Sequence, residues 1–298
     1  MIANDPSHSP QIEITPFLKW AGGKRWLAPR IQKMVEQLEG RYIEPFVGSG
    51  AIYFALAPHR ALLSDVNESL IETYRCVRDS PHEVSKVLGR HDARHSSTYY
   101  YEVRKKVFTK PIERAASFIY LNRTCWNGLY RVNQKGKFNV PIGTKTSALL
   151  PTDDWGRVSE MLSGAQLCTQ DFEKTIDAAK EGDLIFADPP YTVKHNLNGF
   201  IKYNESLFSW EDQIRLRDSL LRAKKRNVLI YATNADHHSV RELYAADFDL
   251  ISLERASVLS GNPSYRGKFN ELFIMANKGQ GRSDACKSQM PGLAAEAS

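Results

Sequence analysis

Features that define several other protein classes are missing from this 298-residue sequence. Its four cysteines form no Cys-x-x-Cys pair, which argues against a zinc site and a disulfide framework and suits a reducing compartment. No apolar run approaches the roughly 20 residues that cross a bilayer, and the N-terminus shows no signal-peptide pattern. We therefore predict no metal site, no membrane association and a cytoplasmic location.

Glycine is scarce where phosphate-binding loops need it. The loop Glu44-Pro-Phe-Val-Gly-Ser-Gly50 follows a predicted strand, but it has only two glycines and no Gly-Lys-Ser/Thr. This excludes a Walker-type phosphate loop. The absence of a third glycine also argues against a nicotinamide dehydrogenase. The two glycines still allow the backbone to approach a ligand closely.

Acidic residues are rare in one stretch of the chain. The whole sequence has 40 Lys and Arg against 34 Asp and Glu, a net charge of +6. Between Arg104 and Lys145 the only acid is Glu113, and aromatic residues such as Trp126 and Tyr130 alternate with the basic ones. Such a stretch could follow a phosphate backbone and present rings to bases. A solvated basic face is the alternative.

Short apolar runs alternate with helical spacing over most of the chain. Residues 68–79 and 210–226 have the spacing of helices. The alternation predicts a Rossmann-like, doubly wound α/β sheet with helices on both faces. The runs that read as strands are 41–44, 60–64, 165–170, 183–187 and 227–233, with 249–255 and 269–276 as a closing antiparallel pair.

The segment 81–155 interrupts this alternation. It has helical spacing at 102–107 and 112–121, and then turn signals such as Asn127-Gly128. We predict an inserted helical subdomain that carries a β-hairpin. The predicted organisation is a disordered N-terminus at 1–14, a catalytic domain formed by 15–80 and 156–278, the insert at 81–155, and a disordered tail at 279–298.

Three acidic residues fall at the ends of predicted strands, namely Glu44, Asp65 and Asp171. Asp65 follows Gly48 by 17 residues, where a carboxylate usually binds the ribose hydroxyls of an adenosine moiety. A glycine loop without phosphate chemistry, followed by an acid, suits S-adenosylmethionine. The ammonium of that cofactor can pair with carboxylates, and its carboxylate can pair with a lysine such as Lys24.

Another acid opens the tetrapeptide Asp188-Pro189-Pro190-Tyr191, directly after a predicted buried strand. Proline cannot donate to a strand ladder, so the two prolines end the strand and stiffen the backbone. The carboxyl ends of strands are also where open α/β sheets bind ligands. A rigid acid beside an aromatic ring suits a flat, amino-bearing ring. An ordinary strand-ending turn is the alternative.

In this order, the motifs resemble those of the Dam-type, alpha-class family of adenine-N(6) DNA methyltransferases. The resemblance covers residues 17–277 and includes Lys19-Trp-Ala-Gly-Gly-Lys24 and Ser64-Asp-Val-Asn67. It implies methyl transfer from S-adenosylmethionine to the N(6) amino group of an adenine flipped out of double-stranded DNA. The residues that it implies as catalytic are Asp188, Pro189, Pro190 and Tyr191. The implied cofactor contacts are Trp20, Lys24, Glu44, Phe46, Gly48, Gly50, Asp65, Asp171, Phe172 and Asp188.

The segment 122–141 resembles the hairpin with which this family reads GATC or a longer site that contains GAT. The resemblance implies that Arg131 contacts guanine and that Asn127 enters the space that the flipped base leaves. Trp126 would lie beside the opened base pair, at a position where the family more often has tyrosine. The implied DNA contacts are Arg123, Trp126, Asn127, Leu129, Arg131, Asn139 and Pro141, with Asn262 and Arg266 in a later loop.

Other functions remain open on the sequence alone. The same cofactor could serve methylation of RNA or of a protein amide, and a DNA-binding relative without activity is a further alternative. The pair His237-His238 could suggest a metal, but no acid-histidine cluster at ligand spacing accompanies it. We predict a monomer or weak dimer, with a cognate restriction or defence protein as a possible partner.

Overall fold

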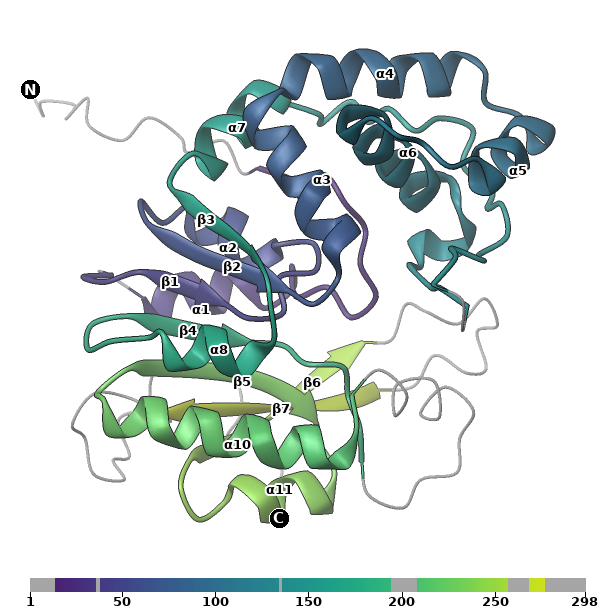
Figure 1. Cartoon of the computed structure of the whole chain (residues 1–298). Helices are drawn as coiled ribbons and strands as arrows, with labels where there is room; N and C mark the ends of the chain where they lie inside the picture. The colour runs from purple at the N-terminus through teal and green to yellow at the C-terminus, as the bar shows by residue number, and fades with distance from the viewer. Residues whose placement is uncertain (1–13, 36–37, 134–135, 194–207, 257–267, 277–298) are drawn as a thin grey trace, which may run out of the picture. The chain divides into compact units, whose positions relative to one another are not determined.

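The computed structural model describes residues 14–35, 38–133, 136–193, 208–256 and 268–276, which form two compact units. The units are both discontinuous along the chain. One, here called the helical unit, comprises the described residues within Met1–Gln32, Gly48–His59 and Asn67–Leu167. The other, the sheet unit, comprises the described residues within Lys33–Val47, Arg60–Val66 and Cys168–Ser298. Figure 1 labels the helices and strands of both units.

The sheet has seven strands in the order β3-β2-β1-β4-β5-β7-β6. β1 pairs in parallel with β2 and β4, and β4 pairs in parallel with β5, whereas β7 is antiparallel to both β5 and β6. Along the chain, one change of unit falls within β3 and another falls near the end of α1. The strands are β1 (Tyr42–Glu44), β2 (Ala61–Asp65), β3 (Ala165–Thr169), β4 (Leu184–Ala187), β5 (Leu229–Ala235), β6 (Asp249–Ala256) and β7 (Lys268–Ala276).

The sheet unit holds three helices, α8 (Phe172–Asp177), α10 (Trp210–Lys225) and α11 (His238–Tyr244). α8 packs against β1, β2 and α10, and α10 also contacts β5 and α11. The start of α10 is determined locally, because the side chains of Ser209 and Asp212 cap it reciprocally. The core of this unit combines apolar strand residues, such as Ile43 and Ile185, with apolar helix residues such as Ile176 of α8, Leu216 of α10 and Val240 of α11. Helices cover these strands, and covered parallel strands are apolar on both faces.

The helical unit is built around α6, which packs against α3, α4 and α5, while α7 packs against α3 and α4. α6 is buried along much of its length, including the polar side chains of Asn122 and Thr124. The helices are α1 (Ala28–Met34), α2 (Ala51–Leu56), α3 (Glu68–Asp79), α4 (Pro81–Ala93), α5 (Ser97–Lys105), α6 (Pro111–Thr124), η1 (Trp126–Gly128) and α7 (Trp155–Leu162). Because α3 and α7 pack with the other helices, this unit extends beyond the segment 81–155.

The α/β class predicted from sequence is confirmed, with a seven-stranded sheet flanked by helices. The predicted helix at 68–79 coincides with α3, and the antiparallel closing pair is β6 and β7. The predicted helix at 102–107 is wrong at both ends. α5 begins earlier because the Ser96 side chain accepts the Tyr99 amide at 3.1 Å, and Lys106 is already extended. The predicted hairpin is present as two isolated bridges, Cys125 with Ile142 and Val132 with Phe138.

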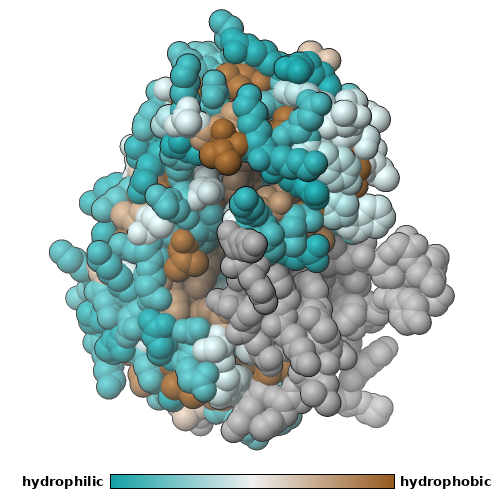
Figure 2. Space-filling model, turned by 45° about the vertical axis from the view of Figure 1, so that its right-hand side comes forward, coloured by the Kyte–Doolittle hydropathy of each residue, from teal (hydrophilic) through white to brown (hydrophobic). Residues whose placement is uncertain are grey.

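The face drawn in Figure 2 is largely hydrophilic, with apolar residues in small groups. Few large apolar side chains are exposed in the described part of the chain, and Trp126 is one of them. Scattered apolar residues of this kind are normal on a protein surface. None of the described helices has the length and apolar character that a membrane span requires.

Candidate active site

Three of the predicted site carboxylates lie at the carboxyl ends of adjacent parallel strands, and a fourth follows the neighbouring strand β3. Glu44 ends β1, Asp65 ends β2 and Asp188 follows β4, and these strands are neighbours in the order β2-β1-β4. Asp171 lies two residues after β3, next to β2, and the Gln170 amide donates to the Asp65 carbonyl at 3.2 Å. The sheet therefore gathers acids that are separated by up to 144 residues in sequence at one edge.

Glu44 is the most buried of these acids, with 3% of its surface exposed. Burial raises its pKa well above the usual value, and the negative charges of Asp188 and Asp65 raise it further. A hydrogen bond from the Tyr42 hydroxyl to Glu44 Oε2, 2.9 Å long, acts in the opposite direction. The negative charges of Asp188 and Asp65 thus act on Glu44, and a cation near these carboxylates would offset their repulsion.

The Asp188-Pro-Pro-Tyr191 corner is held at both ends by side chains from other strands. The Thr233 hydroxyl of β5 donates to Asp188 Oδ1 at 2.6 Å. The Tyr191 hydroxyl donates to Glu271 Oε2 of β7 at 2.9 Å. Burial, followed by the charges of Asp188 and Glu271, raises the pKa of Tyr191 well above its usual value, so the phenol stays neutral.

Three phenylalanines pack beside the carboxylates within the sheet unit. Phe46 and Phe172 stack with centroids 5.4 Å apart, and Phe208 lies 5.7 Å and 5.5 Å from them, respectively. Asp171 caps α8 by accepting the Glu173 amide at 2.9 Å and pairs with Arg215 at 3.0 Å. Phe172 is thus largely a core residue, whereas Phe46 is only partly buried.

In the helical unit, the two glycines of the loop are required by their neighbours. Gly48 has a φ of 48°, and a Cβ atom there would lie 2.7 Å from Cδ1 of Trp20. Gly50 has a φ of 64°, and its Cβ would lie 3.0 Å from the Tyr74 hydroxyl. Larger residues would therefore meet both steric conflict and backbone strain. Trp20 stacks on its other neighbour, Tyr130, with centroids 5.4 Å apart and an interplanar angle of 14°.

Lys24 is the buried cation among the predicted cofactor contacts. Only 3% of its surface is exposed, and its Nζ donates to the Gly22 carbonyl at 2.6 Å. A buried ammonium is costly unless its hydrogen bonds and charge are compensated. The turn at Gly22 therefore positions a lysine that would pair well with an anionic group.

The predicted DNA-contacting segment has an ordered base and an exposed surface. The Trp126 amide donates to the Pro141 carbonyl at 2.9 Å, and the Asn139 amide donates to the Arg131 carbonyl at 3.1 Å. Trp126 is 51% exposed, and Asn127 is exposed with a φ of 55°. Arg131 is also exposed, and its Nε donates to Asn139 Oδ1 at 2.9 Å.

Leu129 is partly buried in the same segment, and its carbonyl accepts the Cys125 thiol at 3.2 Å. The structure thus brings together Trp126, Asn127, Leu129, Arg131, Asn139 and Pro141. Asn262 and Arg266, also predicted to contact DNA, lie outside the described residues.

Arg123 requires a correction, because it is 1% exposed. Its guanidinium forms a bidentate pair with Asp153 at 2.6 and 2.7 Å, and it donates to the carbonyls of Phe17 and Ala148 at 2.9 and 2.8 Å. The side chain therefore holds the helical unit together and is not available to a phosphate. The composition of the basic stretch could not predict this structural role, because the sequence does not distinguish a buried arginine from an exposed one.

Other basic residues of the stretch 104–145 are also engaged by the protein. Arg104 donates to the Val140 carbonyl at 3.0 Å, and Arg114 pairs with Glu72. The basic side chains that the structure shows as exposed are Lys105, Lys106, Lys110, Arg131, Lys137 and Lys145. The basic face is thus smaller than composition suggests.

Sequence reasoning missed Thr233 and Glu271. Thr233 is fully buried in β5 and Glu271 is 6% exposed in β7. A buried acid directly before the apolar run 272–276 is a signal, since such a charge needs a partner. Its partner could not be named, because Tyr191 is 80 residues away in sequence.

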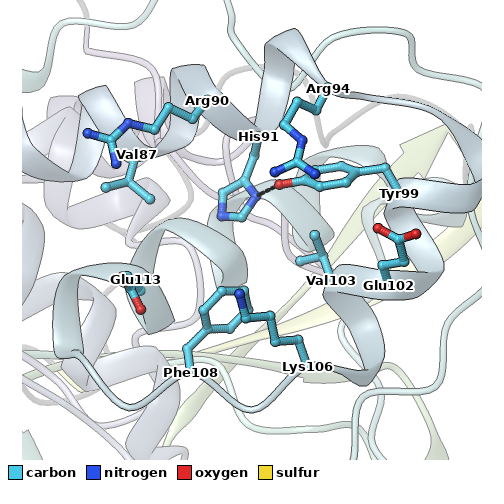
Figure 3. A pocket seen from close by; sticks show the side chains of 10 residues that line it. All are labelled: Val87, Arg90, His91, Arg94, Tyr99, Glu102, Val103, Lys106, Phe108 and Glu113. Carbon is cyan, nitrogen blue, oxygen red and sulfur yellow. Dashed lines mark hydrogen bonds between the residues drawn. The ribbon is translucent and has the colours of Figure 1, made fainter.

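A separate cavity of about 220 Å³ lies in the helical unit, lined by residues of α4, α5 and the start of α6 (Figure 3). His91 Nδ1 lies 2.9 Å from the Tyr99 hydroxyl beside it. Burial, then the charges of Lys106 and Arg94, lowers the pKa of His91 from 6.5 to about 4. None of the predicted site residues lines this cavity, so it is not part of the candidate active site. Among the described residues, no group of three or more His, Cys, Asp or Glu side chains could hold a metal ion.

Comparison with known proteins gives a consistent result. A model of the D12 class N6 adenine-specific DNA methyltransferases matches residues 20–259. The Type II methyltransferase M1.LlaDCHI of Lactococcus lactis is 35% identical over 273 residues, which are 89% of this chain and 96% of the relative. The DNA adenine methylase of Haemophilus influenzae is 34% identical over 278 residues, 90% of this chain and 96% of the relative. The DNA N-6-adenine-methyltransferase of phage P1 is 35% identical over 76% of this chain but only 31% of its own length.

Proposed function

The chain belongs to the D12 class of N6 adenine-specific DNA methyltransferases, and from this premise we propose that it methylates a flipped adenine within GATC or a GAT-containing site of double-stranded DNA. The methyl donor that the family implies is S-adenosylmethionine. The observation that carries the proposal is the corner Asp188-Pro-Pro-Tyr191, which follows the strand β4 beside two further carboxylates.

The donor set of the chain fits this cofactor. Glu44 and Asp65 offer acceptors for an ammonium and for ribose hydroxyls, and their mutual repulsion with Asp188 favours a cationic ligand. Phe46, which is only partly buried, offers apolar surface to an adenine ring, and Phe172 supports it from the core. In the helical unit, the buried Lys24 is suited to a carboxylate and Trp20 to apolar packing. When bound, the cofactor supplies a methyl group already activated by a sulfonium.

Asp188 and Tyr191 would act on the target base. The adenine amino nitrogen is a weak nucleophile, since its lone pair is delocalised into the ring. Hydrogen bonds from this amino group to the Asp188 carboxylate and the Pro189 carbonyl would favour a pyramidal nitrogen aimed at the methyl group. Orientation of this kind can carry most of a rate enhancement. The Tyr191 ring would stack on the flipped base and recover part of the few kcal/mol that flipping costs.

Sequence choice is assigned to the segment around Arg131. An arginine that donates two hydrogen bonds to guanine is the commonest specific contact in the major groove and discriminates by about 1–3 kcal/mol. Asn139 accepts a hydrogen bond from the Nε of Arg131, and among the contacts of the described residues none engages the terminal nitrogens, which we assign to a base. Trp126 and Asn127 are exposed next to it, and the exposed lysines supply phosphate contacts.

The test is to express the chain in a host that lacks DNA methylation and to sequence the modified bases. We expect N6-methyladenine at a single motif that contains GAT, and none with Asp188→Ala, which should still bind duplex DNA. Absence of methyladenine at every motif would refute the proposal. Methyl transfer to RNA or protein by the purified chain, but not to duplex DNA, would indicate one of the alternative acceptors.

The relative from Lactococcus lactis is named a Type II methyltransferase. We extend this to the chain only as part of the proposal, with a cognate restriction or defence protein as its partner. A nuclease that cuts the same motif, and is blocked by the methylation, would support this extension.

A further inference from the structure

A buried acid on β7 holds the aromatic end of the Asp188-Pro-Pro-Tyr191 corner. Glu271 lies directly before the fully apolar run 272–276, whose members are between 0 and 4% exposed, and is itself 6% exposed. Burial of a carboxyl group in such a place costs free energy unless a hydrogen bond compensates it. The Tyr191 hydroxyl supplies one, at 2.9 Å from Oε2.

The register of the sheet explains why this acid reaches the corner. Ala187, the last residue of β4, is opposite Ala232 of β5, so the next pair along these strands is Asp188 and Thr233. Two residues further along β5, Ala235 is opposite Glu271 of β7. The corner therefore follows β4 beside the last residues of β5 and the first part of β7, and each of these two strands contributes one side chain to it.

The two side chains hold the corner at two points. Thr233 holds the Asp188 carboxyl and also hydrogen-bonds the Tyr191 hydroxyl, and the two prolines stiffen the backbone between that acid and the tyrosine. The ring of Tyr191 still has two rotatable bonds of its own. A hydrogen bond at the far end of the ring removes that freedom, as the supporting contacts of a precise site must.

We propose that Glu271 is a positioning residue of the target-base subsite, which fixes the ring plane of Tyr191 for stacking on the flipped adenine. The inference rests on the proposed function, because it presupposes that Tyr191 contacts the base. Glu271 touches neither base nor cofactor in this account and acts only through the tyrosine hydroxyl. Since the phenol is held neutral, it remains a donor throughout the pH range in which a methyltransferase would work.

The test is a double-mutant cycle on single-turnover methylation of a duplex that contains the site. Glu271→Leu removes the acceptor but keeps an apolar volume in an apolar strand, so we expect the thermal midpoint to stay at or above the wild-type value. Its rate should fall roughly tenfold, which corresponds to the loss of one good hydrogen bond. Glu271→Gln keeps an acceptor oxygen and should stay within about threefold of wild type.

Tyr191→Phe is the matched background, since it keeps the ring and removes only the hydroxyl. In that background Glu271→Leu should cause no further loss, because the partner of the acid is already absent. The KM for the cofactor should be the same in all four proteins. Binding to a duplex with an abasic target should also be unchanged, since no base is present to stack.

Two results would overturn the inference while leaving the proposed function intact. One is a wild-type methylation rate in Glu271→Leu. The other is an equal loss of rate on Glu271→Leu whether or not the Tyr191 hydroxyl is present, which would show that Glu271 acts on stability and not through the tyrosine. Failure of the wild-type chain to methylate adenine would instead refute the proposed function and the inference with it.

Discussion

Replacement of Arg123 by methionine separates a structural arginine from a DNA-binding one. The guanidinium is 1% exposed and makes four hydrogen bonds, two to Asp153 and one each to the carbonyls of Phe17 and Ala148. Methionine fills much of the same volume but cannot pair with the Asp153 carboxylate, which is only 11% exposed. That carboxylate would keep the hydrogen bond that it accepts from the Leu150 amide, 3.0 Å long.

Removal of one partner of a buried ion pair typically costs about 3–5 kcal/mol. A domain of this size loses roughly 2–4 °C in thermal midpoint per kcal/mol, so we expect Arg123→Met to unfold at least about 6 °C below wild type. Calorimetry or circular dichroism would measure this shift. DNA affinity, measured at a temperature where the variant is folded, should keep its salt dependence.

Arg131→Met is the matched control, because this arginine is exposed and bonded only through its Nε to Asn139 among the contacts described. It should unfold within about 1–2 °C of wild type but lose discrimination between the cognate site and a variant with guanine replaced. A wild-type midpoint for Arg123→Met, together with a salt slope reduced by about one unit, would refute the buried role and return Arg123 to the phosphate contacts.

Three further outcomes are expected. Thr233→Val should lower the single-turnover rate roughly tenfold, because it removes the hydroxyl that donates to Asp188. Thr233→Ser keeps that donor and should retain most of the wild-type rate. Equal rates for the two variants would contradict this role. Asn139→Ala should relax the choice of base opposite Arg131 while the KM for the cofactor is unchanged, and binding measured on duplexes with single substitutions would show it. Because the folded-state pKa of His91 is lowered from 6.5 to about 4, its contribution to stability should be complete above pH 6.5 and lost as pH falls toward 4. Denaturant unfolding should thus show a loss of up to about 2 kcal/mol between pH 7 and pH 5, and His91→Phe should reduce that loss; an unchanged pH dependence would contradict it.

The fold was accessible from local patterns because a covered parallel strand must be apolar. The apolar runs that form β1, β2 and β4 are recognisable in the sequence for that reason. The helix α3 is recognisable for a different reason, because its apolar residues recur with helical spacing. The β-hairpin of the insert was accessible in outline only. Its bridge between Val132 and Phe138 joins residues six apart, whereas the bridge between Cys125 and Ile142 joins residues 17 apart, which no short pattern encodes. The start of α5 shifted because one serine side chain supplied a cap.

The candidate site divides in the same way. Asp188 and its two prolines form a local motif whose chemistry can be read from residue type and order. The environment of Glu44 is not local, since its raised pKa depends on burial and on acids 21 and 144 residues away. Arg123 shows the converse, because its residue type indicated DNA whereas its burial indicates a structural ion pair.

Residue order and type alone thus determined the α/β class, the glycine loop without phosphate chemistry and the acid-proline-proline-tyrosine corner, because each depends on neighbours within a few positions. Only the tertiary structure decided which side chains hold that corner and which cations are free to meet a phosphate. Strand order and burial bring Thr233 to Asp188, Glu271 to Tyr191 and Asp153 to Arg123 across 45, 80 and 30 residues. At those separations the tertiary packing decides which side chains become partners, and no local sequence pattern predicts that packing.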